Sequence, residues 1–171
     1  MSIVASEIIL RKSAVITDTD ANGGRMTKTA VISGARNALF PNFTIAERAA
    51  GKTRYRKYFF HVANDDDLPL LDGLLSVAAP TPAGDRVTIF AATWDDTQAD
   101  IPASPTRYGA ASLTASTSTG ATSLSVTLEN SDQVIFRDGD KITIWDGENP
   151  ATGEVYTISD VEKTGATVTM Q

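Results

Sequence analysis

The sequence predicts an α+β fold: a mainly antiparallel β N-terminal domain with one or two short helices, followed by a small all-β sandwich or barrel domain. Three observations support this prediction. Short runs rich in Val, Ile and Thr recur along the 171 residues and are separated by Gly, Asn and Asp turns. One helix-start signal lies near residue 44, and a stretch without apolar rhythm, 95–109, separates two parts of different composition. We therefore expect domains at 1–107 and 108–171.

The N-terminal domain is predicted to begin with a hairpin and a helix. Residues 6–18 and 25–33 have the Ile and Val content of strands, and the intervening TDANGG supplies the positive-φ residues of a tight connection. A short helical turn is expected before Pro41. A helix over 45–50 follows, because Thr44 and Glu47 have the spacing of a capping box and Gly51 suits a C-cap.

Further strands are predicted on both sides of the boundary. Residues 53–63 form an aromatic-rich run, 85–94 alternate apolar side chains, and 70–80 are compatible with a strand or a short helix. After the boundary, short Thr, Ser, Val and Ile runs alternate with Gly and Asp turns, as in a small antiparallel sandwich. The final run, ATVTMQ, must pair within its own domain or with another subunit.

Composition excludes several functional classes. The chain has no cysteine and one histidine, which removes disulfides and thiolate sites and leaves too few imidazoles for an ordinary catalytic zinc site, so we expect no enzyme and no cofactor. Residues 1–107 carry twelve Lys and Arg against twelve Asp and Glu, whereas 108–171 carry three against nine, so the net charge of −6 belongs to the second domain. This acidity argues against specific nucleic-acid recognition there.

Targeting signals are not expected either. No stretch approaches 18 consecutive apolar residues, so we expect no membrane span. The first ten residues, MSIVASEIIL, lack a basic leader ahead of an apolar run, and we therefore expect no secretion signal.

One segment has the start of a calcium-loop motif. Asp18, Asp20 and Asn22, followed by Gly23, match the first half of an EF-hand loop. The twelfth position, where calcium needs a bidentate Glu, is Thr29, and the flanking runs predict strands where an EF-hand has helices. The alternative is a solvated hairpin loop whose side chains bond their own backbone.

Other candidate groups for chemistry are the acidic clusters at 65–67, 95–96 and 138–140 and the single His61. Paired carboxylates perform glycosidase chemistry when a cleft holds them at the right separation, but consecutive Asp residues in predicted loops are more typical of turns. His61 lies in a predicted strand between aromatic and apolar residues, and we interpret it as a half-buried residue with a satisfied ring. Phosphate-loop, dinucleotide-binding, nucleophile-elbow and zinc-protease motifs are absent from the sequence.

A stretch of interleaved cations and aromatic residues is the candidate interface. If 53–63 is one strand, cations and aromatic rings occur on both of its faces. Three interpretations remain open: contact with a neighbouring subunit, whose acidic C-terminal domain would receive the Arg side chains; a solvated strand; or single-stranded nucleic-acid binding. We favour subunit contact. The candidate interface residues are Arg48, Lys52, Arg54, Tyr55, Arg56, Lys57, Tyr58 and Phe60.

Residues 33–65, SGARNALFPNFTIAERAAGKTRYRKYFFHVAND, and 79–100, APTPAGDRVTIFAATWDDTQAD, carry a resemblance to a known class. In overall texture they resemble virion structural proteins of contractile-tailed bacteriophages that build the neck, collar, tail tube or baseplate. The resemblance covers roughly residues 1–100. It implies a multi-copy, non-enzymatic subunit that forms a ring with copies of itself and with other phage tail, neck or baseplate proteins, and that is assembled in the host cytoplasm into the virion.

Two alternative functions remain open for this sequence. The C-terminal domain resembles the small Thr-rich β-domains appended to such proteins, and it is a candidate host-surface glycan-binding module if its aromatic residues are exposed. An enzyme that uses Asp pairs, such as a cell-wall glycosidase, is the second alternative. The aromatic residues available for glycan binding are Tyr108, Phe136, Trp145 and Tyr156.

Overall fold

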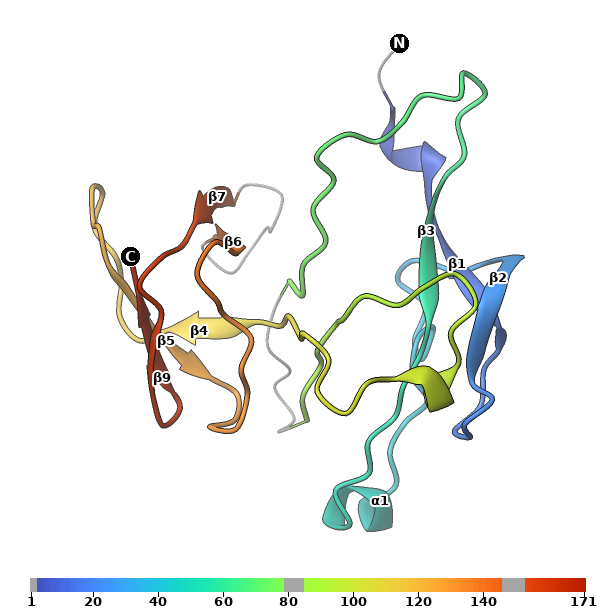
Figure 1. Ribbon diagram of the computed structural model, residues 1–171, viewed down its shortest axis with the longest axis horizontal. Coiled ribbons are helices and arrows are strands. Elements are labelled where there is room, and N and C mark those ends of the chain that lie inside the picture. The colour runs from blue at the N-terminus through green and yellow to red at the C-terminus, as the bar shows by residue number, and fades with distance from the viewer. Residues whose placement is uncertain (1–2, 79–84, 146–152) are drawn as a thin grey trace. The chain divides into compact units, whose positions relative to one another are not determined.

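The structure is a computed structural model, and it describes residues 3–78, 85–145 and 153–171 (Figure 1). Its described strands form three sheets in which neighbouring strands run antiparallel, and helical residues are few, so the predicted β-rich character is confirmed. The chain divides into two compact units. Unit 1 comprises Met1–Gly73 and Ala92–Ala103, and unit 2 comprises Leu74–Ala91 and Ser104–Gln171. The units therefore interleave along the chain, whereas the sequence analysis placed a single boundary after residue 107.

Unit 1 contains a three-stranded sheet in the order β2-β1-β3. A 3-10 turn, η1 (Ala5–Glu7), leads into β1 (Ile8–Val15), which pairs with β2 (Gly23–Ala30) and on its other side with β3 (Tyr58–Val62). The predicted hairpin is thus confirmed. Its connection uses two glycines with φ of 115° and 73°, at the start of β2, where other residues would be strained.

The helix predicted after Thr44 is also confirmed. Helix α1 (Ile45–Ala49) has Thr44 as N-cap and Glu47 as the return partner, and Gly51 just beyond its end has a φ of 69°. The main-chain nitrogens of Glu47 and Thr44 donate to the side chain of the other residue, at 3.2 and 2.9 Å. These bonds satisfy donors that the first helical turn leaves unpaired. In Figure 1, α1 lies beyond one end of the unit 1 sheet, at the tip of an extended loop.

Four predicted elements differ from the structure. The strand predicted at 53–63 begins only at Tyr58, because the side chains just before it lie in a polar network. The strand predicted at 85–94 is wrong: this segment makes only an isolated bridge between Ile89 and Tyr108, since no strand lies alongside to continue the pairing. The described residues 70–78 form neither a helix nor a strand, and the turn before Pro41 is not a helix. A second 3-10 turn, η2 (Gln98–Asp100), was not anticipated.

Unit 2 contains a four-stranded sheet and a two-stranded ribbon. The sheet has the order β4-β5-β9-β8, and the ribbon pairs β6 with β7. The final strand lies between β5 and β8, so it pairs within its own unit, and Gln171 continues the pairing with two main-chain hydrogen bonds to Ser159. The bounds are β4 (Ala111–Leu113), β5 (Leu124–Leu128), β6 (Lys141–Ile144), β7 (Glu154–Thr157), β8 (Glu162–Thr164) and β9 (Thr167–Met170).

Apolar burial is confined to unit 2 among the described residues. Alternate residues of β5 and β9 point inward, and the buried cluster consists of Val126, Leu128, Ile135, Ile158, Val168 and Met170. In unit 1, by contrast, the described residues include no buried hydrophobic side chain; its buried positions are Ser13, Asn22 and Gly23. Unit 1 is therefore organised by polar contacts rather than by an apolar core.

Candidate functional site

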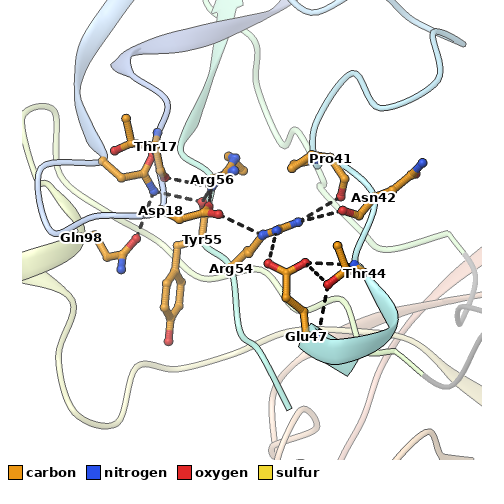
Figure 2. A network of polar contacts seen from close by, with 11 residues as sticks. Thr17, Asp18, Pro41, Asn42, Thr44, Glu47, Arg54, Tyr55, Arg56 and Gln98 are labelled. Carbon is orange, nitrogen blue, oxygen red and sulfur yellow. Dashed lines mark hydrogen bonds and ion pairs between the residues drawn. The ribbon is translucent and has the colours of Figure 1, made fainter. Parts of the chain in front are cut away.

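Arg54 is the centre of a polar network in unit 1 (Figure 2). Its side chain is 8% exposed, and its guanidinium makes two ion pairs: Nε lies 3.0 Å from Asp18 Oδ2, and a terminal nitrogen lies 2.6 Å from Glu47 Oε1. The other terminal nitrogen donates to the main-chain oxygens of Pro41 and Asn42, at 3.3 and 3.2 Å. One face of the guanidinium lies 4.4 Å above the ring of Phe43. Arg54 thereby closes the loop that carries α1.

Arg56 supports the same carboxylate from the other side. Its side chain is 5% exposed, lies 2.8 Å from Asp18 Oδ1 and donates to the main-chain oxygen of Thr17 at 3.0 Å. The hydrogen bond from Arg56, together with the positive charges of both arginines, lowers the pKa of Asp18 below its ordinary value. The pKa of Glu47 is lowered too, first by the main-chain and hydroxyl hydrogen bonds from Thr44 and then by Arg54. Both carboxylates are thus kept in the charged form, in which they make ion pairs with the arginines.

Asn22 connects the hairpin to two remote segments. Its side-chain nitrogen donates to the main-chain oxygen of Tyr55 at 2.9 Å and to the side-chain oxygen of Gln98 at 3.3 Å, and its own oxygen accepts from Thr17. Gln98 also donates its main-chain N–H to the main-chain oxygen of Asn22 at 2.7 Å. A methyl group added at Gly23 would lie 2.8 Å from the oxygen of Asp96, so the 92–103 segment approaches the hairpin too closely for a side chain.

The structure separates the eight candidate interface residues into two groups. Arg54 and Arg56 are engaged within unit 1, Tyr55 and Tyr58 are half-buried, and Lys57 donates to the main-chain oxygens at 94 and 96. Burial lowers the pKa of Lys57 and raises that of Tyr58. The exposed group is Arg48, Lys52 and Phe60. Sequence reasoning did not connect Asp18, Asn22 and Gln98 to this stretch, although the acidic hairpin loop and the nearby arginines were visible as complementary charges.

The calcium candidates have other partners. The Asp18 carboxylate is held by two arginines, and the side chain of Asn22 is used by Thr17, Tyr55 and Gln98, so neither is arranged as an oxygen ligand awaiting a cation. In the described part of the chain, no group of three or more His, Asp or Glu residues could hold a metal ion. Asp20 offers its main-chain oxygen to Ala99.

Three carboxylates of the acidic clusters accept hydrogen bonds from main-chain N–H groups. Asp96 accepts from the main chain of Thr93, Asp140 from that of Arg137, and Asp138 from that of Val161. These bonds are typical of Asp residues that stabilise turns. His61 lies on β3, half-buried, and its Nδ1 accepts a hydrogen bond from Arg11 Nε at 3.0 Å, which confirms the interpretation of a satisfied ring.

Unit 2 contains an apolar groove with a volume of about 420 Å³. Three of the four aromatic residues considered for glycan binding, Tyr108, Phe136 and Trp145, line it, but most of the surrounding side chains are aliphatic. Aliphatic walls offer few hydrogen bonds to sugar hydroxyls and suit apolar side chains better. Tyr156 lies outside this groove on β7 and is 46% exposed. The groove is defined as the surface lined by Leu74, Leu75, Tyr108, Leu113, Ile142 and Trp145 together with their neighbours.

Comparison of the chain with models of protein families, with curated proteins and with solved structures finds no match. Among the described residues, no helix has the length and apolar character needed to cross a bilayer. Three features of the described residues bear on function: the arginine network, the uneven distribution of apolar burial and the groove.

Proposed function

We propose that this protein is a non-enzymatic structural subunit of a contractile phage virion, present in many copies in a ring or collar of the neck, tail or baseplate. Its partners would be copies of itself and other tail, neck or baseplate proteins, and it would be assembled in the host cytoplasm. We also propose that the chain consists of an α+β assembly domain followed by a small acidic β-sandwich or barrel domain. The resemblance of residues 1–100 to such virion proteins supports it.

The observation that carries the proposal is the lack of apolar burial in unit 1. None of its described hydrophobic side chains is buried, whereas Ile32, Ile45 and Phe60 are 72%, 89% and 54% exposed. Burial of apolar surface is the main favourable term in folding and in most protein association. A unit that leaves this surface uncovered gains stability from neighbours, as ring subunits do through their repeated contacts.

Native mass spectrometry of the purified full chain, alone and mixed with the other tail and neck proteins of the same virion, tests the proposal. We expect oligomers of the chain or specific complexes with those proteins. A chain that stays monomeric with every virion partner would refute it. Glycan-array binding by the full chain, abolished by Trp145→Ala, would instead favour the host-surface alternative.

A further inference from the structure

The loop that carries α1 is preorganised for contact. This α1 arm, defined as residues 41–54, is closed at its base by the bonds from Arg54 to the main-chain oxygens of Pro41 and Asn42, and the capping box orders its tip. Ile45, the first residue of the helix, is 89% exposed, more than any other exposed large hydrophobic residue of the described chain. A preorganised loop loses little conformational entropy when it binds, so its apolar tip is well suited to docking.

The groove of unit 2 is an apolar surface of matching character. Four of its lining residues are large hydrophobics that remain well exposed: Leu74 at 57%, Leu75 at 55%, Tyr108 at 42% and Leu113 at 38%. Clustered exposure of this kind marks interaction sites, because single exposed apolar residues are common but contiguous ones are not. A volume of about 420 Å³ accommodates an Ile side chain together with the methyl group of Ala46, which follows it on α1.

Charge selects which unit receives the arm. The arm carries three basic residues, Arg48, Lys52 and Arg54, against one acidic residue, Glu47, which gives it a net charge of +2. Unit 1 has ten basic and eleven acidic residues, whereas unit 2 has five and ten, a net charge of −5. Asp140 and Lys141 both line the groove and balance each other, so the net negative charge lies on the rest of unit 2. Complementary charge thus favours unit 2 as the receiving surface and disfavours contact between two arms.

We propose that the α1 arm of one copy inserts Ile45 into the unit 2 groove of a second copy of this chain. The inference rests on the proposed function and names the contact that would build the ring. The two surfaces belong to different units, so the contact is heterologous: each copy offers an arm and a groove, and repetition closes into a ring when the rotation permits.

Sedimentation velocity of full-length variants tests the contact. Ile45→Asp places a carboxylate at the first turn of α1, where the helix dipole stabilises negative charge. The fold is therefore retained while the apolar tip is lost. We expect self-association at least about tenfold weaker than that of the unmodified chain, the loss of one interface anchor. The matched control is Val134→Asp, an exposed residue of unit 2 outside both the arm and the groove lining, for which we expect a change of less than about twofold.

Cysteine cross-linking gives an independent readout, because the chain has no cysteine of its own. Ile45→Cys and Leu113→Cys chains, mixed and oxidised, are expected to form a mixed disulfide dimer that Val134→Cys does not form with the same partner. A disulfide formed within one doubly substituted chain, independent of its concentration, would overturn the inference, and so would a wild-type chain that shows no self-association. If Ile45→Asp associates as the wild type does, the inference fails but the proposed structural function stands.

Discussion

Replacement of Arg54 by Ala is the sharpest test of the idea that a polar network, rather than an apolar core, organises unit 1. Arg54 donates to two main-chain oxygens of the α1 arm, pairs with Asp18 and lies over Phe43. Counting about 1 kcal/mol for each main-chain bond, and somewhat less for a partly exposed ion pair and for the ring contact, we expect a loss of about 3 kcal/mol.

Tryptophan fluorescence during urea unfolding measures this loss in unit 1 alone. The chain has one tryptophan in each unit, and in a Trp145→Phe background Trp94 reports unit 1, where its ring lies 5.2 Å from that of Phe59. Arg54→Lys retains the charge but not the planar group that reaches two carbonyls and a carboxylate at once, so we expect it to lose roughly half as much.

The matched control is Lys52→Ala, an exposed cation on the same arm, for which we expect a change within about 0.5 kcal/mol. If Arg54→Ala and Lys52→Ala unfold at the same urea concentration, the network does not stabilise unit 1 and the reasoning is refuted.

Four further outcomes follow from the same contacts. The folded pKa of Asp18 is below its ordinary value, so its stabilisation is present above about pH 4 and is lost as the pH falls through the lowered value; Asp18→Asn should flatten the acid limb of unit 1 stability measured by urea unfolding. Gly23→Ala should destabilise unit 1 by more than about 1 kcal/mol, since φ is 115° and the new methyl group would meet the oxygen of Asp96; an unchanged melting temperature would contradict this. Met170→Ala, at a fully buried position of β9, should cost about 2–5 kcal/mol in unit 2, read by Trp145 in a Trp94→Phe background. Raising the salt from 0.05 to about 0.5 M should weaken self-association of the full chain, and association that strengthens with salt would argue against charge complementarity.

Local signals in the sequence correctly predicted several elements. The hairpin follows from a glycine-containing connection between two β-branched runs, and α1 follows from Thr44 and Glu47, three residues apart. The alternation of β5 and β9, with every second residue buried, was visible as alternating Val, Thr and Met. Each of these features depends on residues that are close in the chain, and that is why the sequence was sufficient.

The strand predicted at 85–94 failed for the opposite reason. Its alternation was real, but a strand requires a neighbour, and only Tyr108 provides a bridge to Ile89. Likewise, the cations of 54–57 were expected to face a neighbouring subunit, and the structure instead gives Arg54 and Arg56 an internal partner, Asp18, more than thirty residues earlier in the chain.

The β-rich character, the capped short helix, the lack of cysteine and the acidity of the C-terminal part can all be read from the amino-acid sequence. The interleaving of the two units, the pairing of β9 within its own unit, and the division between apolar burial in unit 2 and arginine contacts in unit 1 became visible in the folded chain. Composition and short-range patterns act within a few residues, whereas burial and ion pairing depend on which distant segments meet, and that choice is made by the packing of the whole chain.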